Sequence, residues 1–137
     1  MLFKPVEYGR LTARQKENFN FQKISAALAD YGFATLRLTD DWNGADFLAV
    51  HIDGLTVLQV QLKGRLTFAK KYRGKNVWIG FPEAGRWFLY PHDELLDIAL
   101  RSTSIQSTNS WEHKGLYSFP YLTEQMKTLL DRYAVSQ

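Results

Sequence analysis

The sequence contains no cysteine and only three histidines, which excludes several kinds of site at the outset. Without cysteine there can be no disulfide framework, thiolate zinc site or cysteine nucleophile. The histidines, at positions 51, 92 and 113, lack the i, i+4 spacing with which a helix presents two imidazoles to one metal ion. A histidine-rich metal centre is therefore not expected.

Long apolar runs are also absent from the sequence. Residues 1–10 lack the apolar core of a secretion signal, and no later run approaches the roughly 20 residues that cross a bilayer. We therefore expect a cytoplasmic protein that has no contact with a membrane.

The sequence does contain enough apolar material for a folded core. Hydrophobic residues make up 45% of the 137, and 4 Trp, 7 Tyr and 9 Phe supply large side chains, so a disordered chain is excluded. The length suits one domain, residues 1–137. The net charge of +3 is compatible with a polyanionic partner but is weak evidence for one.

The stretch 44–63 has the pattern of a β-hairpin. Two runs rich in aliphatic and β-branched residues flank Asp53-Gly54, a strong signal for a two-residue turn. Apart from a few polar residues, both faces of the hairpin are apolar. We therefore expect other parts of the chain to cover the hairpin on both sides.

A turn at this place brings three polar residues together. Asp46 lies opposite Gln61, and Lys63 shares their face because side chains along a strand alternate with period two. Buried groups of this kind are costly unless they are paired or bound to something. Two interpretations are open: a ligand-binding or catalytic cluster, or a buried Asp46–Lys63 ion pair that Gln61 caps with a hydrogen bond.

A helix is predicted from a cap at Thr12 to about Tyr31, where Gly32 ends it, because Thr-Ala-Arg-Gln is a capping-box pattern. Its apolar stripe consists of Phe21, Ile24, Leu28 and Tyr31. Glu17 lies seven residues before Ile24, on the centre line of that stripe, and is expected to face the core. It either gains from the helix dipole beside an arginine or reaches the Asp46 cluster. Its position alone does not separate these two roles.

The segment after the hairpin is basic. Five of the twelve residues 64–75 are basic and none is acidic; the five are Arg65, Lys70, Lys71, Arg73 and Lys75. Phe68 and Tyr72 lie among them, and basic residues interleaved with aromatic ones suit contact with a phosphate backbone. The alternative is a solvated surface turn. The segment begins directly after the polar cluster, which favours the first interpretation.

The remaining elements follow from hydrophobic periodicity and turn residues. The expected elements are a strand at 33–38, a loop at 39–44, strands at 76–81 and 87–91 joined by 82–86, a helix at 93–101, an edge strand at 111–119 and a closing helix at 122–133.

A helix with an inward glutamate, then a strand, then an antiparallel pair bearing Asp and Gln-x-Lys resembles the PD-(D/E)xK nuclease superfamily, the fold of restriction endonucleases and Holliday-junction resolvases. The motif reads Ala45-Asp46, followed fifteen positions later (61 − 46 = 15) by Gln61-Leu62-Lys63. The Gln form is similar to Mrr-like restriction enzymes and small intron-homing endonucleases. The resemblance spans about residues 12–75. It implies an α/β (α+β) fold, a restriction-endonuclease-like mixed sheet flanked by helices with core order α-β-β-β.

The resemblance also implies a metal site. The ligands of Mg²⁺ (or Mn²⁺), a hard cation that prefers oxygen, would be Asp46, the Gln61 side-chain oxygen, the Leu62 backbone carbonyl and Glu17. Lys63 would orient or activate the attacking water, and the basic segment would hold the nucleic-acid backbone. Two departures from the family pattern are Ala45 in place of Pro and Gln61 in place of Glu. Because Gln61 removes a negative charge, metal binding rests more heavily on Asp46 and Glu17.

The function that follows from the resemblance is that of a metal-dependent DNA endonuclease. Cutting both strands usually needs two active centres, so a homo-oligomer is expected. The alternative, motivated by Gln61 and the modest net charge, is a non-catalytic module that binds nucleic acid or protein and retains the nuclease fold. Residue types do not distinguish DNA from RNA as the substrate.

Overall fold

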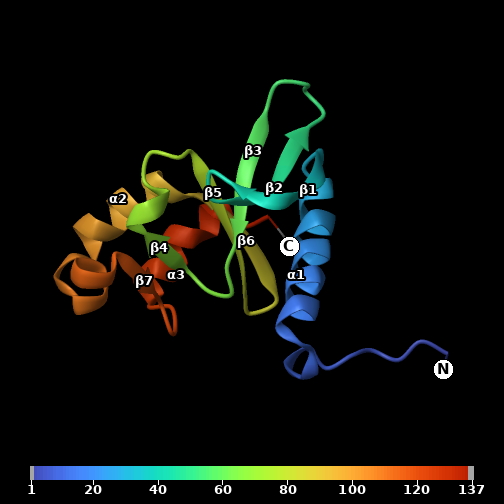
Figure 1. Ribbon diagram of the computed structural model, residues 1–137. Coiled ribbons are helices and arrows are strands. Elements are labelled where there is room, and N and C mark those ends of the chain that lie inside the picture. Colours follow the sequence, from blue (N-terminus) through green and yellow to red (C-terminus); the bar gives the residue numbers. More distant parts are fainter. Residues whose placement is uncertain (1, 136–137) are drawn as a thin grey trace.

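The computed structural model describes residues 2–135, and of Asp41 the backbone alone. Its centre is a five-stranded sheet of order β1-β2-β3-β5-β6, in which β3 and β5 run parallel and the other neighbours antiparallel (Figure 1). The sheet strands are β1 (Phe33–Trp42), β2 (Ala45–His51), β3 (Val57–Leu62), β5 (Val77–Glu83) and β6 (Arg86–Pro91). The helices are α1 (Ala13–Ala29), α2 (His92–Ser102) and α3 (Glu124–Leu130), and β4 (Thr67–Ala69) pairs with β7 (Leu116–Ser118). The expected mixed sheet flanked by helices, with core order α1-β1-β2-β3, is confirmed.

Helix α1 begins at the predicted cap. The Thr12 side chain accepts a hydrogen bond from the Gln15 N–H at 3.2 Å, and the Gln15 side chain accepts one from the Thr12 N–H at 2.9 Å. The helix ends at Ala29, two residues before the predicted end, and Gly32, with φ of 85°, then turns the chain into β1. Tyr31 therefore lies beyond the helix and is 46% exposed, so its predicted place in the apolar stripe is wrong.

Strands β2 and β3 pair in the predicted register. Phe47 lies opposite Val60 and Val50 opposite Val57, which continues to Asp46 beside Gln61. The prediction of a two-residue turn is wrong, because residues 52–56 separate the two strands. The Asp53 carboxylate accepts hydrogen bonds from the N–H groups of residues 55 and 56, at 2.7 and 2.8 Å, and so closes a wider loop.

Strand β1 is longer than predicted and carries a bulge. The expected loop at 39–44 is mostly strand, and the turn is the Asn43-Gly44 pair, with φ of 53° and 85°. These positive values are those of the tight hairpin turn that Asn-Gly favours. Arg37 pairs with Phe47 and Trp42 with Ala45, so the four residues 38–41 of β1 lie opposite one residue of β2. That one residue is Asp46.

The two faces of the sheet are covered unequally. Helix α1 covers one face, where Ile24 and Leu28 pack with Phe47, Ala49 and Val60. On the other face, α2, α3 and the segments between them cover β5 and β6 in a second core (Figure 1).

The second face stays open over β1, β2 and β3. There Leu36 is 58% exposed and Val57 is 49% exposed. The expectation that the hairpin is covered on both sides is therefore wrong.

The C-terminal half agrees with the predicted strands and helices except at the edge strand. Trp111 is buried in a π-helical turn, Ser110–Lys114, and only Leu116–Ser118 of the expected strand 111–119 pairs with β4. Burial of the large indole fixes that turn at the place of the predicted strand. The expected closing helix is α3, followed by a 3₁₀ turn at Asp131–Tyr133. None of the helices within residues 2–135 is long and apolar enough to cross a membrane.

Candidate active site

A pocket of about 770 Å³ opens where the N-terminal half of α1 meets the ends of β1, β2 and β3. The residues that line it are Arg14, Glu17, Arg37, Leu38, Thr39, Asp40, Ala45, Asp46, Gln61, Leu62 and Lys63. Four of them are the predicted catalytic residues Glu17, Asp46, Gln61 and Lys63, and Leu62 is the predicted backbone ligand. The fold thus brings together residues from one helix and two strands that the sequence selects separately.

The β1 bulge and the β3 backbone place Asp46 at the floor of this pocket. Its side chain is half-buried, and its Oδ2 accepts a hydrogen bond from the Leu62 N–H at 2.8 Å. The Gln61 Nε2 lies 3.5 Å from the Leu62 carbonyl oxygen, a long contact for a hydrogen bond. Asp46, the Gln61 amide and the Leu62 carbonyl therefore gather at one end of the β2–β3 pair.

Lys63 follows directly after β3. Its backbone N–H donates to the Gly80 carbonyl at 2.9 Å, which extends the pairing of β3 with β5 by one residue. The ammonium lies 5.5 Å from the centroid of the Tyr72 ring, within the range of a cation–π contact. Tyr72 itself is buried, so the ring gives the flexible lysine a fixed wall beside the pocket.

Glu17 reaches the pocket from α1, but its side chain is exposed, and the prediction that it faces the core is wrong. The buried residues of the helix are Ile24 and Leu28, two and three turns further along. The first turns of α1 project past the edge of the packed core. The helical phase therefore turns Glu17 toward the sheet, but at this position the sheet side of the helix borders the open pocket and not the core.

Two arginines in the pocket were not predicted. Arg14 lies three residues before Glu17, on the same side of α1. Arg37 is held in place: its guanidinium donates to Asn18 at 2.5 Å and lies 5.1 Å from the centroid of the Phe21 ring. The charge of the two arginines makes the pocket suited to an anion such as a phosphate group.

The i, i+3 spacing from Glu17 was a signal for Arg14. Arg37 pairs with Phe47 and so lies on the face that α1 covers, and strand alternation alone does not group it with Asp46.

The donors of the pocket fit a hard cation. Glu17, Asp40 and Asp46 supply carboxylates, and the Gln61 amide and the Leu62 carbonyl supply neutral oxygens. The Gln61 amide turns its nitrogen toward the Leu62 carbonyl, and a rotation of the amide by 180° would place its oxygen there instead. Residues 2–135 hold no cluster of three or more His, Asp or Glu arranged around a common point. The donor set therefore suits Mg²⁺ that keeps several waters, rather than a cation enclosed by protein.

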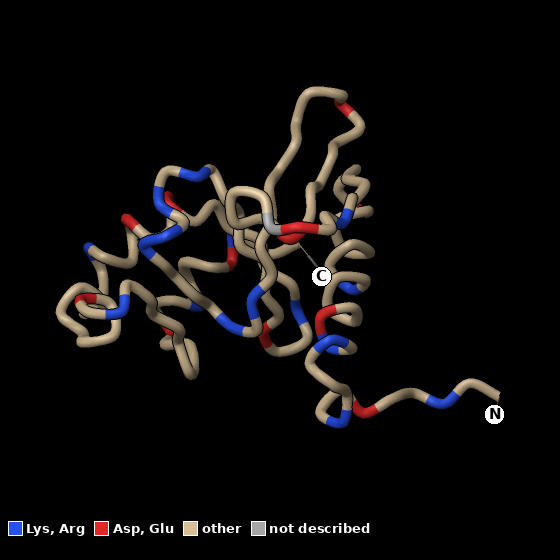
Figure 2. The backbone as a smooth tube through the Cα atoms, viewed as in Figure 1, with Lys and Arg blue, Asp and Glu red and all other residues tan. Residues whose placement is uncertain are grey.

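The predicted basic residues lie outside the pocket. Arg73 forms an ion pair with Asp97 at 3.3 Å, and the Lys70 ammonium lies 5.3 Å from the Trp111 ring. Figure 2 shows the basic positions between β3 and β5 spread along the backbone of that segment rather than gathered at one point. Arg65, Lys71 and Lys75 are exposed.

The aromatic residues of this basic segment do not have the predicted role. Phe68 is fully buried and Tyr72 is 3% exposed, so neither ring can stack on a base. The pairing of β4 with β7 places Phe68 in the core, a contact between segments far apart in the sequence. In this segment, only the charged residues can therefore contact a phosphate backbone.

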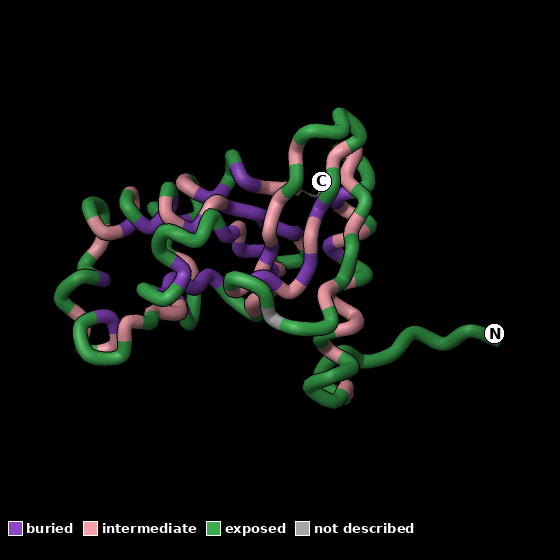
Figure 3. The backbone as a smooth tube through the Cα atoms, turned by 45° about the horizontal axis from the view of Figure 1, so that its top comes forward, coloured by how far each residue is buried: buried purple, intermediate pink, exposed green. Residues whose placement is uncertain are grey.

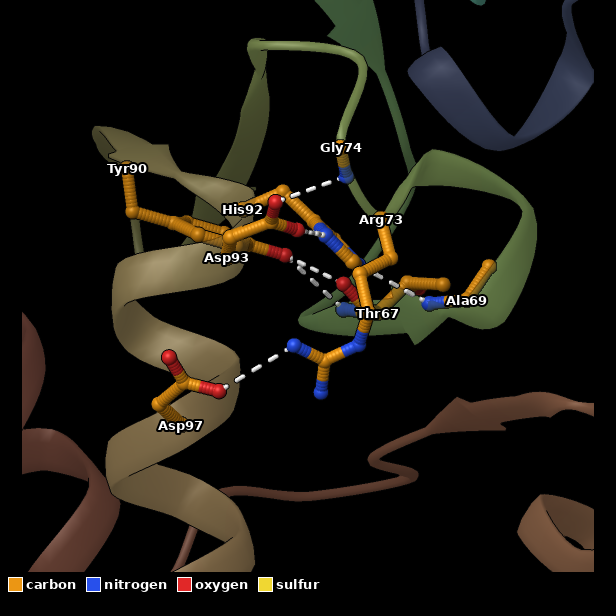
Figure 4. Close-up of polar contacts among 8 residues, drawn as sticks. All are labelled: Thr67, Ala69, Arg73, Gly74, Tyr90, His92, Asp93 and Asp97. Atoms are coloured by element: carbon orange, nitrogen blue, oxygen red, sulfur yellow. Dashed lines mark hydrogen bonds and ion pairs between the residues drawn. The ribbon is translucent and has the colours of Figure 1, made fainter.

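A buried histidine network anchors the basic segment to the C-terminal core (Figure 4). The His92 Nε2 accepts a hydrogen bond from the Ala69 N–H at 3.0 Å, so the proton lies on Nδ1, which donates to Asp93 at 2.8 Å. The other oxygen of Asp93 accepts from the Gly74 N–H at 2.8 Å. The Tyr90 hydroxyl donates to the Thr67 carbonyl at 2.5 Å.

The charge state of this network follows from its burial. Burial lowers the pKa of His92 below its usual 6.5, and the hydrogen bond and charge of Asp93 only partly oppose this. Burial would raise the pKa of Asp93, but the Gly74 N–H and His92 outweigh it and lower that pKa. Burial raises the pKa of Tyr90 far above its usual value. A neutral His92 and an ionised Asp93 therefore hold both ends of the segment 69–74.

Comparisons with known proteins find similarities among solved structures. The chain is similar to Hjc, a Holliday junction resolvase from the archaeal hyperthermophile Archaeoglobus fulgidus, with a TM-score of 0.46 and 17% sequence identity. The similarity covers 57% of this chain and 74% of Hjc. No family model matches the sequence, and no curated protein matches it significantly. The function of this chain is therefore inferred from its own residues.

Proposed function

We propose that this chain is a metal-dependent DNA endonuclease of the PD-(D/E)xK type. One observation supports this above the others: Glu17, Asp46, Gln61 and Lys63, which come from separate elements, line a single pocket. Carboxylate and amide oxygens can hold a divalent cation, and a lysine can place positive charge at a phosphate, which are parts that metal-assisted phosphodiester hydrolysis uses.

In this proposal each residue has a defined task. The residues that would hold the cation are Asp46, Glu17, the Gln61 side-chain oxygen and the Leu62 carbonyl. When bound, Mg²⁺ or Mn²⁺ supplies Lewis-acid polarisation of the phosphoryl oxygen and stabilises the leaving 3′ oxygen. Lys63 donates a hydrogen bond that orients the attacking water, and its charge offsets the negative charge that grows at the phosphate.

The arginines of the pocket and the basic segment complete the proposal. Arg14 and Arg37 line the same pocket as the carboxylates and would contact the scissile phosphate or its neighbour. Arg65, Lys70, Lys71, Arg73 and Lys75 would hold the DNA backbone at a distance from the cut. These contacts position the duplex without reading its sequence. We further propose membership of the Gln-x-Lys subgroup, with Mrr-like and intron-homing enzymes, and action as a homo-oligomer in the cytoplasm.

The proposal is tested with supercoiled plasmid in Mg²⁺ or Mn²⁺. The wild-type protein should nick or linearise the plasmid, and EDTA or Asp46→Ala should abolish the product. Asp97→Ala is the matched control, because Asp97 is an exposed carboxylate that pairs with Arg73 and lies outside the pocket. Cleavage that Asp46→Ala leaves unchanged contradicts the assignment of the site.

One observation favours the non-catalytic alternative. The Gln61 side chain turns its nitrogen, rather than the oxygen that a metal ion would need, toward the Leu62 carbonyl at 3.5 Å. A protein that binds DNA with strong salt dependence but gives no product with any divalent metal would support a binding module.

A further inference from the structure

The open half of the sheet carries a continuous apolar surface. Its members, which we call the open face, are Leu36, Leu48, Val50, Ile52, Leu55 and Val57. Directly opposed residues of antiparallel strands share a face. The pairs Leu36–Leu48 and Val50–Val57 therefore form successive rows across β1, β2 and β3. Ile52 and Leu55 lie next to these rows in the loop 52–56.

The exposure of this surface is unusual for a monomer. Leu55 is 88% exposed, Ile52 84%, Leu36 58%, Val57 49% and Val50 38%. Figure 3 shows the end of the β2–β3 hairpin exposed and projecting from the body of the molecule. The largest apolar patch on a typical monomer measures roughly 300–600 Å² and often has a function. These five side chains together reach that range.

The open face is also held rigidly. Besides its two backbone hydrogen bonds, the Asp53 carboxylate accepts one from the Thr56 hydroxyl at 2.6 Å. The Ile52 N–H donates to the Gly32 carbonyl at 2.9 Å, and His51 contacts the Tyr31 carbonyl at 3.0 Å, so the loop is fastened to the end of α1. A surface that is already ordered loses little conformational entropy when it binds.

The charges around this surface decide between two kinds of partner. None of the six residues is charged, and the acidic residues at its two ends are Asp53 in the loop and Asp46 at the pocket. Because none of the six is Lys or Arg, the open face offers no positive charge to a phosphate backbone. A flat, neutral apolar face is complementary to a copy of itself related by a two-fold axis.

We propose that the open face is the interface of a homodimer, with a second copy of this chain as its partner. Specific interfaces bury roughly 800 Å² on each partner, and the six residues, with Ala34 and Gln59 beside Val50 and Leu48 on the same face, would form the apolar centre of such an interface. Interfaces of homodimers are also more apolar than the remaining surface.

Dimerisation through this face has a consequence that rests on the proposed function. Asp46 and Gln61 follow Leu48 and Gln59 along the same face, so each pocket opens at the margin of the interface. Two centres would then share one composite surface, an arrangement that cleavage of both DNA strands usually needs. A variant that cannot dimerise should nick supercoiled plasmid but produce less linear product than the wild type.

The interface is tested by sedimentation equilibrium of the full chain without metal or DNA, at about 1 to 100 µM. Val50→Glu and Val57→Glu place like charges in the interface. Leu116→Glu and Phe3→Glu are the controls, because Leu116 is a strand residue that is 40% exposed and Phe3 is an apolar arm residue that is 80% exposed. Circular dichroism and urea unfolding show whether each variant is folded.

We expect the wild type and both controls to sediment with twice the mass of the chain. Val50→Glu and Val57→Glu should remain folded and raise the dimer dissociation constant by roughly 100-fold. A monomeric wild type over the whole range overturns the proposal, as does a dimer that only Phe3→Glu disrupts. Because this measurement needs neither metal nor cleavage, a dimer without nuclease activity would refute the proposed function alone.

Discussion

Gly80 occupies a place in β5 where the contact between α1 and the sheet can be tested quantitatively. A Cβ atom at this position would lie 2.5 Å from the Ile24 Cδ1 atom, well inside the optimal carbon–carbon separation of about 3.5–4.0 Å. Ile24 is fully buried, so its side chain can move away only if its neighbours in the core repack. The backbone of Gly80 is not in the left-handed region, so the cost of Gly80→Ala is steric. We expect it to destabilise the protein by about 1–3 kcal/mol.

A double-mutant cycle tests whether the destabilisation by Gly80→Ala is steric. Ile24→Val removes the clashing Cδ1 atom and alone should cost about 0.5–1.5 kcal/mol. Combined with Gly80→Ala it should cost less than the sum of the two, with a coupling energy of roughly 1 kcal/mol or more. Gly64→Ala is the control, because a Cβ there meets no atom within 4 Å, and we expect a change within about 0.5 kcal/mol.

Urea unfolding followed by tryptophan fluorescence measures all four free energies. Strict additivity of Gly80→Ala and Ile24→Val would refute the steric reasoning. So would a Gly80→Ala cost as small as that of Gly64→Ala. Because α1 also carries Glu17, the same contact sets the position of one pocket wall.

Three further predictions concern stability. Burial lowers the pKa of His92 in the folded protein, so the unfolded chain binds the proton more readily. The free energy of unfolding should therefore fall as the pH drops below about 6.5, by up to about 1.4 kcal/mol per pH unit. Urea unfolding at pH 5.5 to 7.5 should show this loss reduced in His92→Gln, and an equal loss in both proteins would contradict it. The Gln59 Oε1 atom is buried without a hydrogen-bond partner among the described residues, so Gln59→Met should stabilise the protein by roughly 1 kcal/mol. A lower free energy of unfolding for this variant in urea would contradict the prediction. Thr12→Ala removes the cap of α1 and should cost about 0.5–2 kcal/mol, whereas a neutral effect in the same assay would show that the cap is dispensable.

The hairpin register could be predicted from the sequence because it depends on symmetry about one dipeptide. The observed pairing of Phe47 with Val60 and of Val50 with Val57 is centred on Asp53-Gly54, as a two-residue turn would be, so both place Asp46 beside Gln61. The error in the turn therefore did not propagate to the site. The capping box of α1 was also predictable, since it depends on residues only three positions apart.

The features that the sequence did not reveal depend on long-range contacts. The bulge of β1 arises because Asn43-Gly44 makes the turn while Trp42 still pairs with Ala45, and the turn-rich composition of 39–44 hid that pairing. Composition likewise could not show that Phe68 is buried, because β4 pairs with a strand far along the chain. The exposure of Glu17 depends on where the packed core ends beneath α1.

The most direct test of the proposed metal centre is a titration with Mn²⁺, followed by electron paramagnetic resonance of the free ion. It requires no DNA, so a rare target sequence cannot obscure the result. We expect the wild type to bind Mn²⁺, Asp46→Ala to bind at least tenfold more weakly, and Asp97→Ala to bind like the wild type. Equal binding by the wild type and Asp46→Ala, or no binding by the wild type, would contradict a metal centre built on Asp46.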